Sequence, residues 1–196
     1  MTRPIPQNDS ERWMLLRAAH HQYHVSTTAN YDEVLFDVAE RFATHQSIGK
    51  VEIGGLLIWK RLQANTRWAM DLMNVPDQRV HELTRDAYLA ANDRSLSIPE
   101  AARAARSALG SLPGCKTGDA LASAVLLAAA PQRLAVYDRR AHHGLNLLGL
   151  TLTSGKGKYS RYMDIVEHLR HLAHSNAAAW TARDVDVALY KIGGPR

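Results

Sequence analysis

Thiol chemistry has little place in this sequence, because its 196 residues include one cysteine, Cys115. A single thiol cannot close an internal disulfide or supply the several thiolates of a cysteine-rich zinc site or an iron–sulfur cluster. The chain also lacks the run of about 20 apolar residues that a membrane-spanning helix needs. Its first residues lack the apolar segment of an export signal. We therefore expect a cytoplasmic protein with no membrane contact.

Strand patterns are scarce as well, since β-branched runs are few and short. Alanine and leucine dominate 87–130, and apolar residues recur at helical spacing in most segments. With 46% hydrophobic residues, a chain of this length can bury one compact core without a metal or a disulfide. These features predict an all-α fold.

Helix-start and helix-stop residues locate the individual helices. Asn30 is a plausible N-cap, Pro76 and Pro99 suit first turns, Pro131 stops a helix, and Thr181 caps the last one. Residues 1–30 form an N-terminal extension or a first helix. The predicted helices span 31–46, 51–62, 77–91, 100–109, 118–130, 138–149, 159–174 and 181–191.

The balance of charge is basic, with a formal net charge of +5 and a pI near 9.5. Basic residues gather at 59–67, 137–143 and 154–162. Such clusters suit a polyanion, although solvated surface lysines and arginines explain them equally well. Charge alone does not decide between these interpretations.

Residues 105–149 carry the most specific pattern. They predict a helix, a tight hairpin, an Ala-rich helix, a proline stop, a short extended piece, and an aspartate, Asp138, that opens another helix. A glycine hairpin before a helix presents backbone N–H groups and the positive helix end to one spot, which suits a phosphate. Lys116 and Thr117 beside Gly118 add to that site.

This segment resembles the helix-hairpin-helix of the base-excision DNA glycosylase superfamily that includes endonuclease III and 8-oxoguanine DNA glycosylase. The matching stretches are LPG at 112–114, the KTGDALASAVL junction, and AVYDRR at 135–140. With IWKR at 58–61, VHELTRDAY at 80–88 and RDVDVALYKIG at 183–193, the chain is similar to small bacterial members. The resemblance covers 48–193. It implies a glycosylase-like domain over 31–193, built as a two-lobed helical bundle with a cleft between the lobes.

The resemblance makes Asp138 the catalytic residue, since a carboxylate stabilises the positive charge that develops on the sugar. Members that also cleave the strand use a Schiff-base lysine, and the matching positions here hold Ser107 and Ala120. This implies a monofunctional glycosylase. Lys116 replaces a hairpin glycine, and in a shifted register it could restore lyase activity. The plainer interpretation of Asp138 is a helix cap.

The implied partner is double-stranded DNA with one damaged or modified base flipped out of the stack, bound by a monomer. Repair and defence against phage DNA both fit, and a non-catalytic DNA-binding protein or an all-α interaction protein are the alternatives. The candidate DNA contacts are Gly114, Lys116, Thr117, Gly118, Arg139, Arg140, Lys156, Lys158 and Arg161. The candidate base-pocket residues are Lys60 and five aromatic residues that could instead pack in the core: Trp59, Trp68, Tyr137, Tyr159 and Tyr162.

No metal or cofactor is expected beyond a monovalent cation at the hairpin. The histidines form two groups, 20–24 and 168–174, whose spacing places imidazoles on one helical face. Neither group has a carboxylate or a thiolate nearby in sequence that would complete a metal site, so surface histidines are the better interpretation.

Overall fold

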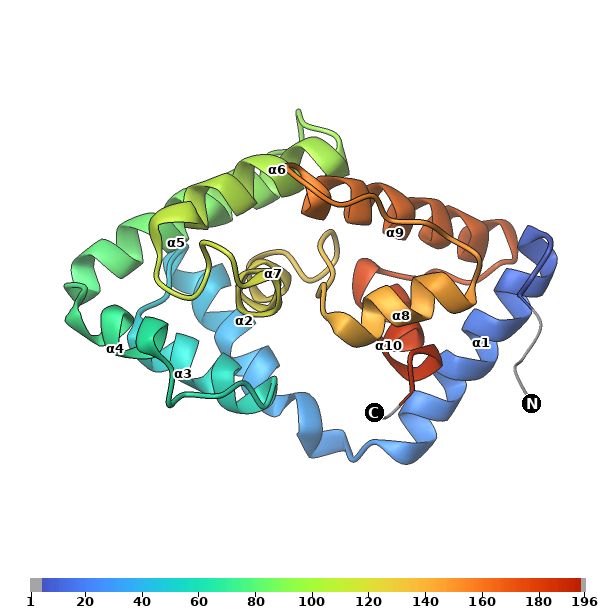
Figure 1. Cartoon of the computed structure of the whole chain (residues 1–196), viewed down its shortest axis with the longest axis horizontal. Coiled ribbons are helices and arrows are strands. Elements are labelled where there is room, and N and C mark those ends of the chain that lie inside the picture. Colours follow the sequence, from blue (N-terminus) through green and yellow to red (C-terminus); the bar gives the residue numbers. More distant parts are fainter. Residues whose placement is uncertain (1–4, 195–196) are drawn as a thin grey trace.

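The computed structural model describes residues 5–194, and within this range every regular element is a helix (Figure 1). The all-α prediction is therefore confirmed. No helix in this range is both long and apolar enough to cross a bilayer. The α-helices are α1 (Asp9–Ser26), α2 (Glu33–His45), α3 (Lys50–Trp59), α4 (Arg67–Asn74), α5 (Asp77–Asn92), α6 (Ile98–Ala108), α7 (Asp119–Ala129), α8 (Arg139–Leu147), α9 (Lys158–Ser175) and α10 (Ala182–Ile192).

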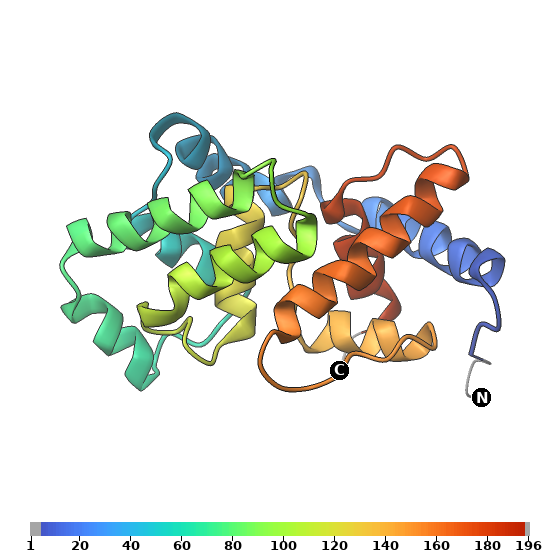
Figure 2. The same ribbon diagram turned by 90° about the horizontal axis from the view of Figure 1, so that it is seen from above.

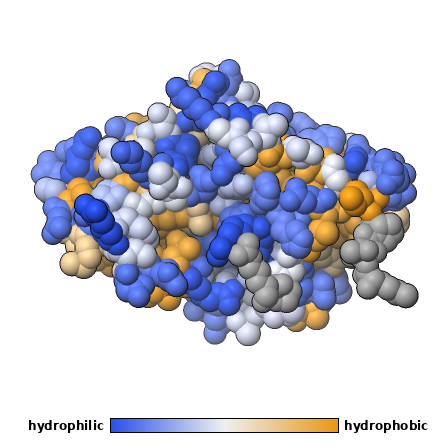
Figure 3. All heavy atoms as spheres, viewed as in Figure 1, coloured by the Kyte–Doolittle hydropathy of each residue, from blue (hydrophilic) through white to orange (hydrophobic). Residues whose placement is uncertain are grey.

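The helices fall into two groups, with α2 to α7 on one side and α1 with α8 to α10 on the other (Figures 1 and 2). One contiguous hydrophobic core runs through both groups, and α6 packs against α9 where they meet. On the face in Figure 3, hydrophilic side chains separate the apolar surface into patches. The two lobes with a cleft between them stay a prediction.

Within the predicted stretch 1–30, of which 1–4 lie outside the described residues, α1 forms a first helix that belongs to the core. Asn8 caps α1 by accepting a hydrogen bond from the Glu11 N–H at 2.9 Å. Trp13 is buried, and its ring lies 5.0 Å from that of Trp180, centroid to centroid. The chain therefore brings its two ends together, with α1 along α10 (Figures 1 and 2).

Two local predictions need correction. Asn30 does not cap a helix, because Ala29–Asp32 form a 3-10 turn and α2 begins at Glu33. Asp32 occupies the N-cap position without a side-chain cap, since its carboxylate accepts from Trp59 Nε1 at 2.9 Å and from Arg183. Helix α4 was not predicted, because it is a short helix of 8 residues in which only Leu72 is buried.

The hairpin between α6 and α7 depends on two glycines. Gly114 has φ +84°, which L side chains adopt at a cost, and a Cβ there would lie 2.4 Å from the Trp68 ring. A Cβ on Gly118 would lie 2.2 Å from the carbonyl oxygen of Gly114. Between them, Cys115 is buried, and burial raises the pKa of its thiol to about 12. The hairpin is thus held tight by close backbone approach.

Candidate functional site

Asp138 is the N-cap of α8. The segment before it is extended and fixed from both sides, because Tyr137 N–H donates to Ser123 Oγ at 2.9 Å and Tyr162 hydroxyl donates to the Val136 carbonyl at 2.8 Å. Asp138 Oδ1 accepts from the N–H groups of Arg140 and Ala141, both at 2.9 Å. The helix-capping interpretation is therefore confirmed as one role of this residue.

The second carboxylate oxygen of Asp138 faces a lysine from the other group of helices. Lys60, at the end of α3, donates from Nζ to Asp138 Oδ2 at 2.7 Å. The two side chains are only 12% and 17% exposed. Burial raises the pKa of Asp138, but the charge of Lys60 and the backbone N–H groups outweigh it and hold that pKa below its ordinary value. Asp138 is therefore ionised at neutral pH.

Asp138 lines a pocket of about 830 Å³, which we call the Asp138 pocket. The start of α7, the start of α9 and one face of α8 form its walls. A nucleobase-sized ligand fits this volume, which is within the usual range for small-molecule sites. The pocket is lined by Gly118, Asp119, Ala120, Tyr137, Asp138, Arg139, Arg140, His142, His143, Asn146, Lys158 and Gly193.

A second hollow, of about 970 Å³, lies beside the first and is called the hairpin groove. The two share Asp119 and Lys158, whose side chains form an ion pair at 2.6 Å. Six basic side chains line the groove against one carboxylate, so its potential favours an anion. These basic residues are Arg103, Arg106, Lys116, Lys156, Lys158 and Arg161.

The structure brings most of the predicted phosphate contacts to these two hollows. Lys116, Thr117 and Lys156 are exposed in the hairpin groove, whereas Gly118, Arg139 and Arg140 line the Asp138 pocket. Arg103 and Arg106 were missed. Their spacing of three residues on one helix before the hairpin was the available signal, because it places both on one face of α6.

Two of the predicted DNA contacts have other tasks. The Arg161 guanidinium donates to the carbonyl oxygens of Lys156 at 2.9 Å, Ser154 at 3.0 Å and Thr153 at 3.1 Å, so it holds the 153–157 loop together. Gly114 packs under Trp68 and lines neither hollow. Arg161 and Gly114 therefore differ from the predicted phosphate contacts, because one contacts loop carbonyls and the other the Trp68 ring.

Tyr137 is the predicted base-pocket aromatic that lines the Asp138 pocket. Its ring is mostly buried, its hydroxyl lies 3.2 Å from His142 Nδ1, and Lys158 Nζ lies 4.8 Å from its centroid. Tyr159 and Tyr162 differ from the prediction, because both rings are in the core. Their hydroxyls donate to the carbonyls of Ala135 at 2.9 Å and Val136 at 2.8 Å, so they anchor the extended segment.

The tryptophans also differ from the predicted pocket. Trp59 is buried, and its indole N–H donates to Asp32, while Trp68 packs on Gly114. Lys60 contacts Asp138 but lines a separate small hollow with Tyr190. Tyr190 was missed by sequence reasoning. It lies 3.4 Å below the Arg140 guanidinium, as measured to the ring centroid, and accepts from Arg61 at 2.9 Å.

Comparison with known proteins leaves these geometric features as the basis for a functional conclusion. The chain matches no protein-family model, no curated protein and no solved structure.

Proposed function

We propose that this chain is a monofunctional DNA glycosylase that removes a damaged or modified base and leaves an abasic site. The observation that carries the proposal is the position of Asp138. Its ionised carboxylate lies in a pocket large enough for a base, directly beside a groove of basic side chains and hairpin backbone. A carboxylate near a flipped nucleotide and cations on its phosphates are the two requirements of base excision.

In the proposed reaction the bond between C1′ and the base nitrogen breaks, and its electron pair leaves with the base. Positive charge develops on the sugar and is stabilised by the Asp138 carboxylate. A water oxygen then bonds to C1′, and its proton passes to Asp138 or to the departing base. Lys60 keeps Asp138 ionised, and at the same time its charge offsets part of the carboxylate field at the sugar.

Double-stranded DNA is the proposed partner. Lys116 and Lys156 are exposed and free to neutralise phosphates, and the hairpin N–H groups add a site that does not depend on sequence. The histidines and the amide of Asn146 in the Asp138 pocket can hydrogen-bond the edge of an extruded base. This pocket sets the proposed choice of base.

A non-catalytic DNA-binding protein is the second candidate, and one observation favours it. Both oxygens of Asp138 are engaged, one by the start of α8 and the other by Lys60. A carboxylate used only to cap a helix and close an ion pair needs no substrate. The two candidates share the hairpin groove and differ only in what Asp138 does.

Duplex oligonucleotides that each carry one oxidised, alkylated or hypermodified base separate the two candidates. After incubation with the protein and heating in alkali, the glycosylase predicts strand breaks at the lesion that disappear with Asp138→Asn. Asparagine still caps a helix, which keeps the fold. Binding to every duplex without any break supports the non-catalytic protein instead.

Borohydride trapping tests the absence of lyase activity. Lys60 Nζ lies 2.7 Å from Asp138, where an ion-paired amine is a poor nucleophile. We expect base release without a covalent protein–DNA adduct. An adduct that is lost in Lys60→Gln or in Lys116→Gln would contradict the monofunctional mechanism and would identify the amine responsible.

A further inference from the structure

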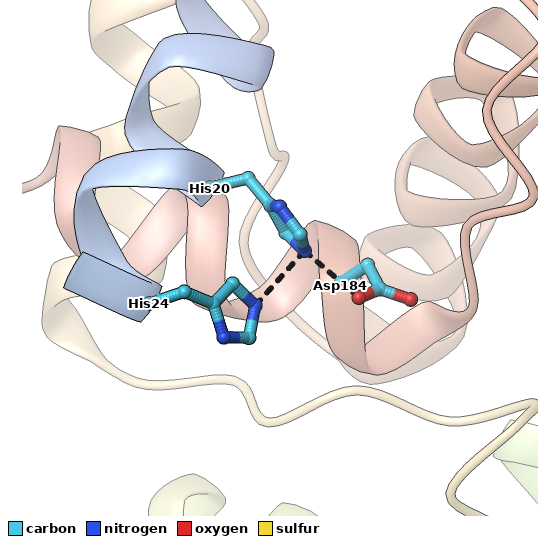
Figure 4. Close-up of side chains that lie close together, drawn as sticks. All are labelled: His20, His24 and Asp184. Carbon is cyan, nitrogen blue, oxygen red and sulfur yellow. Dashed lines mark hydrogen bonds and ion pairs between the residues drawn. The ribbon is translucent and has the colours of Figure 1, made fainter. Parts of the chain in front are cut away.

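Three metal-ligating side chains meet where α1 lies against α10, outside both hollows (Figure 4). His20 and His24 are one helical turn apart on α1, and Asp184 comes from the first turn of α10. His20 Nε2 lies 2.9 Å from Asp184 Oδ1 and 3.2 Å from His24 Nε2. No carboxylate lies near these histidines in the sequence, but folding brings Asp184 beside His20 from 164 residues away.

Hydrogen bonds alone do not satisfy the three ligand atoms of this cluster. His20 Nε2 carries at most one hydrogen, which points along the ring and aligns well with only one of its two close neighbours. A hydrogen directed at Asp184 leaves the His24 contact without an aligned donor. A cation between the three atoms would accept a lone pair from each of them.

The spacing of the ligand atoms suits such a cation. In a tetrahedral zinc site with Zn–N bonds of ~2.0–2.1 Å, neighbouring ligand atoms lie about 3.3 Å apart. Two of the pairs here are separated by 2.9 and 3.2 Å, and all three ligand atoms lie within 4.8 Å of one another. Small rotations of the two imidazoles suffice to enclose an ion.

The surroundings hold two of the ligands in place. Asp184 Oδ2 accepts from the N–H and the hydroxyl of Thr181 at 2.8 and 2.7 Å, which leaves Oδ1 directed at His20. The Trp180 ring stacks on His20 with centroids 4.7 Å apart. Outer contacts of this kind orient the ligands in metal sites. His24 is exposed, so solvent can supply the remaining ligand.

The neighbouring charges do not oppose a cation. The nearest guanidinium, Arg183, is paired with two carboxylates, Asp32 at 2.8 Å and Asp186. These partners balance the charge of Arg183, and Asp184 adds a negative charge beside the two histidines. The local charge therefore favours a divalent ion.

We propose that His20, His24 and Asp184 form a binding site for a divalent transition-metal ion of the zinc class. Two imidazole nitrogens and one carboxylate oxygen are a common donor set for such ions. The ion would link the first helix to the last one and so stabilise the closure of the chain ends. This site is independent of the proposed glycosylase activity.

Calorimetric titration of the chelator-treated full chain with zinc chloride tests the site. We expect one zinc ion per chain, binding at least about tenfold weaker in His24→Ala, and a zinc-dependent rise in Tm that this variant lacks. His24 is exposed, so its loss should leave the fold intact. The matched control, His21→Ala, removes an exposed histidine of the same helix and should bind zinc as the unmodified chain does.

Cobalt(II) gives a second readout, since nitrogen and oxygen ligands at a site of low coordination number produce a visible absorption band. The band should form with the unmodified chain and with His21→Ala, and it should be lost with Asp184→Asn as well as with His24→Ala. Equal zinc affinity of the unmodified chain and His24→Ala would overturn the proposal. Failure of the unmodified chain to bind either ion would overturn it too.

Discussion

Two aspartates at helix starts, the N-cap Asp138 of α8 and the capping-box Asp184 of α10, divide their oxygens in a similar way but have different surroundings. Each uses one oxygen for groups at its own helix start and points the other at a basic side chain from a distant helix. For Asp138 that partner is Lys60, a fixed cation. For Asp184 it is His20, and an imidazole ring can ligate a metal ion. The local motif orients the carboxylate, and the distant partner decides its chemistry.

Accessibility separates the two sites as well. Asp138 lies at the wall of a base-sized pocket next to a basic groove, whereas Asp184 lies beside the exposed His24 on the outer face of α1 and α10. The role proposed for Asp138 is to act on a ligand that enters the pocket. The role proposed for Asp184 is to hold an ion taken from solvent. The predictions below test this division of roles.

The largest effect is expected for the reaction at Asp138. Two unit charges ~4 Å apart at an effective dielectric near 20 interact by about 4 kcal/mol, or roughly a thousandfold in rate. Asp138→Asn should therefore lower the rate of base release about a thousandfold, measured by alkaline cleavage under single-turnover conditions. DNA affinity should stay unchanged. Asp164→Asn, an exposed aspartate of α9, is the control, and equal rates for both variants would remove Asp138 from the chemistry.

The ion pair gives the next largest effect, on stability. Breaking a fully buried pair costs ~3–5 kcal/mol. Because Lys60 and Asp138 keep 12% and 17% exposure, we expect Lys60→Met to lower the free energy of unfolding by about 2 kcal/mol in urea titrations. The double variant with Lys60→Met and Asp138→Asn should lose less unfolding free energy than the two single variants lose in sum. Additive losses would show that the pair contributes no coupling.

Acid should weaken both aspartate sites. The pKa of Asp138 is lowered, and hydrogen bonds from His20 and Thr181 overcome burial to set the pKa of Asp184 at about 2. Both carboxylates are more acidic in the folded chain, so their stabilisation is complete above the unfolded pKa of ~3.9 and is lost as pH falls below it. Unfolding free energy should fall between pH 5 and about pH 2. The difference between the unmodified chain and Asp138→Asn should narrow over that interval, and a constant difference would contradict the assignment.

The smallest effect concerns phosphate contact beside Asp138. Each phosphate contact contributes about 0.9 to the slope of log affinity against log salt. Lys156→Gln should reduce that slope by about one contact, measured by fluorescence anisotropy with duplex DNA. Lys191, on the side of Asp184, donates to Ser26 at 2.9 Å, and Lys191→Gln is the matched control that should leave the slope unchanged. A similar change of the slope in both variants would contradict the placement of DNA at the hairpin groove.

Much of the local structure could be predicted because it depends on neighbours in sequence. Pro99, Pro131 and Thr181 mark helix ends that the structure has within two residues, and Asp138 begins α8 as expected. The error at Asn30 arose because Asp32, two residues later, is recruited by Trp59 and Arg183. A contact between distant segments overrode the local cap preference there.

The site residues were harder to predict, because burial decides whether an aromatic or basic side chain is available. Tyr159 and Tyr162 are aromatic residues of the kind that line base pockets, but both are buried in the core. Arg161 could contact a phosphate by its charge, but its guanidinium donates to a carbonyl of its own loop. Arg103 is a candidate phosphate contact because packing of α6 places it in the hairpin groove. Nothing in the spacing of the two tyrosines or of Arg161 gives their accessibility.

The sequence by itself determined most of the helices, the tight hairpin and the aspartate that opens α8, since these depend on periodicity, glycine and capping over a few residues. Only the tertiary structure decided that Lys60 lies against Asp138 and that Asp184 joins His20 and His24. The pairs are separated by 78 and 164 residues along the chain, and packing of whole helices, not local preference, brings such positions together.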